Sequence, residues 1–162
     1  MGRPDDTGPR VLHEDPYVTV YLDEHERLVL LVRTSRQFPS IAALQDCYRA
    51  VIQVYDRLGR LGRNLLVDSR APTGRNDPEY ERAMFALLPA LDRGFGRIGV
   101  LVQTAVGKLQ FRRWQGVDGI ERIISSDEVQ LRDQLRAGVD GGADRGADEA
   151  PGRVRGKPEP RR

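Results

Sequence analysis

The sequence predicts an α/β fold, in which a mixed, largely parallel sheet of five strands has an N-terminal antiparallel hairpin and about four helices. Short apolar segments with the period of a strand alternate with longer segments whose apolar residues recur every three or four positions. From the second predicted strand onward, a helix follows every strand, which is typical of parallel sheets. The length of 162 residues suits one domain with a sizeable core.

The first two predicted strands form the hairpin. In residues 17–23, aliphatic residues alternate with tyrosine and threonine, which is the period of a strand with two unlike faces. Residues 28–32 are a nearly unbroken apolar run, typical of a strand that is covered on both faces. The short polar turn at 23–26 joins the two, so we expect them to pair antiparallel.

Two long helices have clear start signals. Ser40 is the expected cap of the first helix, which ends at Gly59. The second helix begins at Asp77 with Pro78 in its first position, and Pro89 is expected to kink or end it. The first helix buries an apolar stripe of Ile41, Leu44, Tyr48, Val51, Tyr55 and Leu58.

Three further strands are predicted, at 65–67, at 98–102 and, as a short strand, within 121–126. A third helix follows the second of these strands. Ser125 and Glu128 stand in capping-box spacing, so the last helix is expected to start there.

The composition changes at both ends of the chain. Residues 11–137 form the predicted domain, and residues 1–10 are a predicted flexible N-terminus. Residues 138–162 are rich in glycine, proline and mixed charge, with only two large aliphatic residues, which predicts a disordered tail.

Charge and cysteine content exclude several function classes. The 26 basic residues nearly balance the 24 acidic ones, so the net charge of +2 does not indicate nucleic-acid binding. Cys47 is the one cysteine, and with two histidines it makes a poor ligand set for zinc, so no metal or cofactor is predicted. No segment has the ~20 apolar residues of a membrane span or the apolar core of a signal peptide, so a cytoplasmic location is expected.

The most informative segment is NLLVDSRAPTGRNDP, residues 64–78, which runs from an apolar strand through a polar loop into a helix. In a parallel sheet such junctions gather at the carboxyl ends of the strands, where ligands and partners dock. The predicted contact residues at this edge are Arg36, Asp68, Arg70, Thr73, Arg75, Asn76 and Thr104.

The residues at this edge suggest two chemical interpretations. Asp68 and Thr104 end strands as the phosphate-accepting aspartate and the hydroxyl do in response-regulator receivers, but the acidic pair that would hold magnesium is missing. Arg70 and Arg75 flank Gly74 before a helix N-terminus, a place that favours an anion. Alternatively, Gly74 serves a tight turn and the arginines pair with acidic residues of the second helix. In either case the two arginines are expected to be exposed.

The third helix offers a second candidate surface with Lys108, Arg112, Arg113 and Trp114. Tryptophan and arginine often contribute most of the binding energy of an interface, which favours a docking surface for a protein. Alternatively, this is a solvated charged face with Trp114 folded under the edge of the sheet. The sequence leaves both interpretations open.

The order of elements over residues 17–136 resembles that of the STAS domain, and more closely the SpoIIAA-like (STAS/SEC14-type) group. The resemblance rests on the opening hairpin, the long first helix, the strand ending in LLVDSR and the segment RIGVLVQTAVGKLQFRRW. It implies a regulatory module. The anti-sigma-factor antagonists of the family have a phosphorylatable serine in a DSSG-like turn, where this sequence has APTGRNDPEYE, so the resemblance does not extend to that serine.

The sequence thus predicts a non-enzymatic, STAS-like regulatory module that docks an unidentified protein partner through the loops at the carboxyl edge of its sheet. The alternative is a carrier or sensor in which a small anionic or lipidic ligand sits among the same loops or between sheet and helices. An enzyme is not expected, because the loop has no activated nucleophile and no convincing base. A hydrolase triad of the α/β-hydrolase type is excluded, because Ser69 lacks a G-x-S-x-G elbow and no histidine follows it in the chain.

Overall fold

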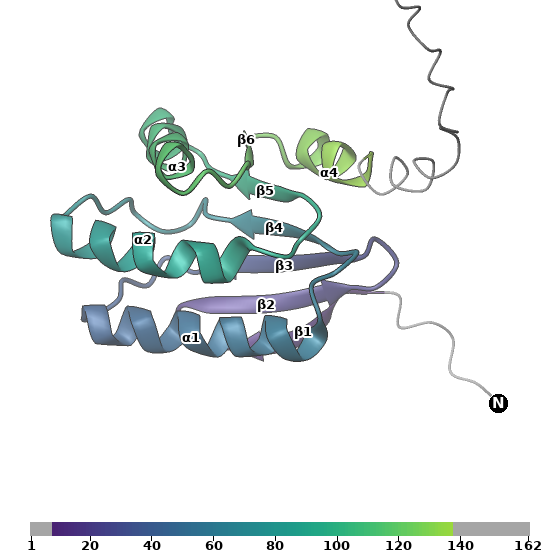
Figure 1. Ribbon diagram of the computed structural model, residues 1–162, viewed down its shortest axis with the longest axis horizontal. Helices are drawn as coiled ribbons and strands as arrows, with labels where there is room; N and C mark the ends of the chain where they lie inside the picture. The colour runs from purple at the N-terminus through teal and green to yellow at the C-terminus, as the bar shows by residue number, and fades with distance from the viewer. Residues whose placement is uncertain (1–7, 138–162) are drawn as a thin grey trace, which may run out of the picture.

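The computed structural model describes residues 8–137, so the predicted tail and most of the predicted N-terminal segment lie outside the described residues. Within this range, six strands form one sheet in the order β1-β2-β3-β4-β5-β6 (Figure 1). The strands are β1 (Arg10–Glu14), β2 (Val18–Asp23), β3 (Leu28–Arg33), β4 (Asn64–Asp68), β5 (Ile98–Leu101) and β6 (Ile123–Ser125). The helices are α1 (Ile41–Leu58), α2 (Pro78–Asp92), α3 (Ala105–Asp118) and α4 (Glu128–Arg136).

The α/β class and the mixed sheet with an antiparallel start are confirmed, but the count of five strands was wrong. β1 precedes the predicted hairpin and pairs antiparallel with β2. The carboxylate of Asp15 shapes the turn between them by accepting N–H groups of Tyr17 at 2.7 Å and Val18 at 2.9 Å. β1 has a weak sequence signal because it is an edge strand with a register shift after Val11, whose side chain is 50% exposed.

The parallel part of the sheet places three helices on one face. The connections through α1, α2 and α3 each step to the neighbouring strand in the same direction. Such crossovers are right-handed in ~98% of cases, so the three helices cover the same face, where α1 and α2 lie side by side (Figure 1). The strand order never reverses, so this sheet lacks the switch-point crevice at which open α/β sheets usually bind ligands.

The fourth helix covers part of the opposite face. Leu131 and Leu135 of α4 pack on Leu28, Leu66 and Leu101 of the central strands. α4 lies close to β5: a Cβ added at Gly99 of β5 would lie only 2.9 Å from a methyl group of Leu131.

Two details of the helices differ from the sequence prediction. The cap of α4 is Asp127, whose carboxylate accepts the N–H of Gln130 at 3.0 Å, and not Ser125. α2 continues past Pro89 to Asp92, because a proline so near the C-terminal end removes a single hydrogen bond of the helix. The predicted caps of α1 and α2 are confirmed.

We predict that Gly99→Ala lowers the free energy of unfolding by ~1–3 kcal/mol, because the added methyl group must displace the buried Leu131 side chain. Gly116→Ala is the control, since a Cβ there meets no atom within 4 Å and alanine favours a helix over glycine by ~1 kcal/mol. Urea unfolding of both variants measures the difference. Equal stability of the two would show that α4 does not press on β5.

Candidate functional site

A cavity of about 720 Å³ lies between the helix-covered face of the sheet and the helices α2 and α3. This volume is within the ~300–1,000 Å³ of typical ligand pockets. The walls are mostly apolar and include Leu65, Val67 and Val100 from the sheet and Met84, Leu88 and Leu91 from α2.

The cavity extends along the length of the strands, from their carboxyl ends towards their amino ends. α2 starts at the carboxyl edge, beside the loop after β4, and ends at Asp92 shortly before β5 begins. The lining residues follow the same course, from Thr73 and Tyr80 at the carboxyl edge to Leu91 and Asp92 at the other end. At the carboxyl edge the rim includes Val106 and Leu109 of α3, which are 72% and 62% exposed.

One carboxylate holds α3 against α2. Glu81 of α2 accepts hydrogen bonds from Trp114 Nε1 at 2.7 Å, Arg113 at 2.6 Å and Gln110 at 2.9 Å. All three donors belong to α3, in which Trp114 is the one buried side chain. Together with the packing of Trp114 and Phe111 on the core, these charge-assisted bonds keep α3 in place as a wall of the cavity.

A second set of ion pairs joins the far ends of the same two helices. The Arg122 side chain has no exposed surface and bonds Asp92 of α2 at 2.7 Å and Asp118 of α3 at 2.6 Å. Burial raises the pKa of Asp92 to about 6, although Arg122 acts in the opposite direction. Asp92 is thus the acidic group at this end of the cavity, and it already has a basic partner.

Five of the seven predicted contact residues line this cavity, and two do not. Asp68 stands two residues after Leu66 on β4, and alternate residues of a strand face the same side of the sheet. Because Leu66 packs against α4, the Asp68 side chain lies on the face opposite the cavity, near α4. Arg36 is exposed and is not part of the cavity wall. The five lining residues are Arg70, Thr73, Arg75, Asn76 and Thr104.

The arginines of the loop after β4 are bound within the protein, so the prediction that they are exposed was wrong. Arg70 pairs with Asp68 at 2.6 Å and with Glu128 of α4 at 2.9 Å, and these bonds raise its pKa. Arg75 bonds Asp77 at 2.8 Å. Their charges are therefore matched by acidic groups of the loop, of α4 and of the α2 cap.

The third helix also uses its polar groups internally. Thr104 caps α3 by accepting the N–H of Gly107 at 3.0 Å. Trp114 is 2% exposed, so its indole belongs to the core and not to a docking surface. Of the two interpretations of this helix, the folded tryptophan is confirmed.

Sequence reasoning missed the polar residues at the sheet side of the cavity, which are Arg33, Tyr48 and Tyr80. Arg33 ends β3 in phase with Val29 and Leu31, so it points to the helix-covered face. This alternation of buried residues along β3 was the sequence signal that could have placed Arg33 on that face. Because an arginine at the end of a strand usually faces water, the residue type alone favours an exposed Arg33, whereas it is buried in the structure.

The chain matches no family model, no curated protein and no solved structure. Among residues 8–137, no group of three or more His, Cys, Asp or Glu side chains could hold a metal ion. In the same range the helices are too short or too polar to cross a membrane. The function must therefore be argued from the cavity itself.

We predict that Glu81→Gln destabilises the protein by ~2–3 kcal/mol, because it weakens three bonds to α3 and leaves Arg113 without its partner. The emission of Trp114, the single tryptophan, should shift to longer wavelength as water reaches the indole. Urea unfolding and fluorescence spectra measure the two effects.

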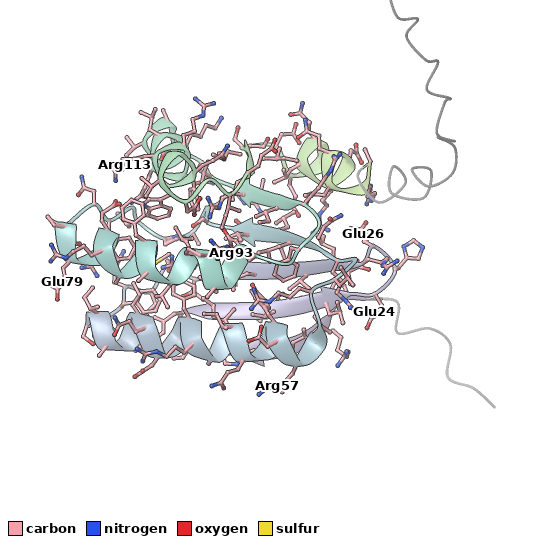
Figure 2. The ribbon with its side chains drawn as sticks, in the orientation of Figure 1. Glu24, Glu26, Arg57, Glu79, Arg93 and Arg113 are labelled. Atoms are coloured by element: carbon pink, nitrogen blue, oxygen red, sulfur yellow. The ribbon has the colours of Figure 1, made fainter. Side chains whose placement is uncertain are left out.

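Glu79→Gln is the matched control. Glu79 lies in the same first turn of α2, so it has the same relation to the helix dipole, but its side chain is exposed (Figure 2). This variant should change stability by ~0.5 kcal/mol or less. Equal effects of the two variants would mean that Glu81 acts through the helix dipole and does not hold α3.

Proposed function

We propose that this protein binds a small, largely apolar organic molecule in the cavity between the sheet and the helices α2 and α3, as a carrier or sensor. The observation that supports the proposal is the size of this cavity together with its apolar wall. Protein interiors are otherwise packed as densely as organic crystals, and voids larger than a water molecule are few. An occupant would bring the walls into contact and recover the dispersion energy that an empty cavity lacks.

The rim at the carboxyl edge supports the same proposal. Val106 and Leu109 expose most of their side chains while lining the cavity, so an apolar path leads from the surface to the interior. The neighbouring loop contributes polar side chains at Thr73 and Asn76. This distribution suits a molecule that enters with its apolar part first and keeps a polar group near the sheet edge.

A binding role, without catalysis, is the second part of the proposal. Asp92 is the one acidic side chain among the described lining residues, and it is paired with Arg122. A general base must lie within hydrogen-bond reach of the proton that it removes, and the Oδ2 atom of Asp92 is held by Arg122 instead. The arrangement at Asp92 joins α2 to α3 and thus supports a structural role for this carboxylate.

Docking of a protein partner at the carboxyl edge is the second candidate function. The exposed Val106 and Leu109 favour it, because exposed apolar side chains that lie close together often mark an interface. The regulatory role implied by the resemblance to STAS domains would use this edge. Docking and ligand binding can be separated, because a ligand alone stabilises a carrier, whereas a docking module responds only to its partner.

We predict that the neutral fluorescent probe N-phenyl-1-naphthylamine binds in the cavity, with enhanced probe emission and energy transfer from Trp114. Val67→Phe should weaken the affinity at least about tenfold, because the larger ring fills space that the probe needs. A fluorescence titration measures both.

Val32→Phe is the control for this prediction. Val32 is half-buried like Val67, but it lies on the opposite face of the sheet. Its substitution should leave the affinity unchanged within about twofold. If the probe does not bind the wild-type protein, or if both variants weaken binding equally, the cavity is not the binding site.

For the docking candidate, we predict that Val106→Ser combined with Leu109→Ser abolishes recovery of a specific partner while stability changes by ~0.5 kcal/mol or less per site, since both residues are exposed. Affinity purification followed by mass spectrometry measures recovery. Val117→Ser, at an exposed position near the other end of α3, is the control. Equal recovery with all variants would argue against this edge as an interface.

A further inference from the structure

Arg33 is a buried cation at the sheet side of the cavity. The residue is 8% exposed, and its guanidinium lies 5.1 Å from the ring centre of Phe38 and 5.9 Å from that of Tyr48. Its Nε atom is buried and has no hydrogen-bond partner within residues 8–137. The aromatic faces attract the charge, and the phenol oxygens of Tyr48 and Tyr80 lie nearby, but none of these neutral groups is an anion that matches it.

The charge of Arg33 persists in this environment. Burial by itself lowers the pKa of Arg33, whereas the nearby hydroxyl groups of Tyr48 and Tyr80 raise it, and the net pKa lies above the ordinary value. Buried charged groups in proteins are normally paired. A guanidinium that lines a cavity and has no carboxylate partner among residues 8–137 therefore leaves a place for an anionic ligand.

The other charged groups of the cavity wall are already matched. Arg70 pairs with Asp68 and Glu128, Arg75 pairs with Asp77, and Arg113 pairs with Glu81. Among the four arginines that line the cavity, Arg33 alone has no carboxylate within 4.0 Å in the described part of the chain. One unmatched cation calls for a ligand with a single negative charge.

We propose that the cavity binds a monocarboxylate whose carboxylate group pairs with the guanidinium of Arg33 and whose hydrocarbon chain lies along Met84 and Leu88. This inference rests on the proposed function and adds the chemical class of the ligand. The planar guanidinium of Arg33, which lines the cavity, has N–H donors in a fixed fork that matches the two oxygens of a carboxylate. A phosphate dianion would need a second free cation, which the wall lacks because its other arginines are paired.

The test compares dodecanoate, dodecanol and dodecyl phosphate, which have the same chain and different head groups. Titrations follow the emission of Trp114 in the wild-type protein, below the concentration at which each compound aggregates. We expect dodecanoate to bind at least about tenfold more tightly than dodecanol, as charge-assisted hydrogen bonds in a buried site allow. Dodecyl phosphate should bind less tightly than dodecanoate.

Two substitutions assign the preference to Arg33. Arg33→Met keeps an apolar chain of similar length and should bind dodecanoate and dodecanol equally, while Arg33→Lys should retain only part of the preference, because it lacks the planar pair of donors. Arg36→Met removes an exposed arginine three residues away and should preserve the full preference. If Arg33→Met does not fold, the comparison of the three head groups in the wild-type protein and the binding measured for Arg33→Lys still test the proposal.

The outcomes separate the two proposals. Equal affinity of the wild-type protein for dodecanoate and dodecanol would overturn the role of Arg33 and leave small-molecule binding intact. Tighter binding of dodecyl phosphate, or a preference for dodecanoate that survives in both Arg33 variants, would overturn the assignment of a monocarboxylate to this residue. If none of the three compounds and no neutral probe binds, the proposed function itself fails.

Discussion

The cavity exists because the carboxylate of Glu81 holds α3 at the edge of the helical layer. An ordinary surface helix of this length buries a stripe of apolar residues, whereas α3 buries Trp114 alone and leaves Val106, Leu109 and Val117 largely exposed. The three hydrogen bonds from α3 to Glu81 thus add to a short apolar contact that consists mainly of Trp114 and Phe111. A helix that is held mainly by polar bonds, at Glu81 and through Arg122 at Asp118, need not fill the space beneath it, and the cavity lies in that space.

The topology of the sheet explains why this space lies where it does. Three successive crossovers put α1, α2 and α3 on one face, and the sheet order never reverses. This sheet therefore has no switch point, and the cavity lies between the sheet and the helices. At the opposite end of the strands, Glu24 and Glu26 stand at the turn between β2 and β3 (Figure 2). Glu26 pairs there with Arg132 and Arg136, which anchors α4 and is separate from the cavity.

Charge pairing explains the difference between the expected and the observed site. The sequence favours the loop arginines Arg70 and Arg75 as anion-binding residues because they precede a helix N-terminus, but both pair with carboxylates of the chain. Arg33, which has the same chemistry, remains unmatched within the described residues and faces the cavity. The acidic groups around each arginine thus distinguish Arg70 and Arg75, which are paired within the chain, from Arg33, which we propose binds a ligand. Those groups come from distant segments, such as Glu128 beside Arg70, and sequence spacing does not reveal them.

The sequence by itself determined the elements that depend on local chemistry. Ser40 and Asp77 start their helices because each side chain accepts a backbone N–H three residues later, and the periods of the apolar residues define α1, β2 and β3. Only the tertiary structure decided that β1 joins the sheet, that Trp114 is buried and that Arg33 faces a cavity. Each of these depends on partners far along the chain, namely β2 for the edge strand, Glu81 for the indole, and the aromatic rings of α1 and the following loop for the guanidinium. Local propensity is a property of a few neighbouring residues, whereas burial and charge pairing are properties of segments that meet only in the folded chain.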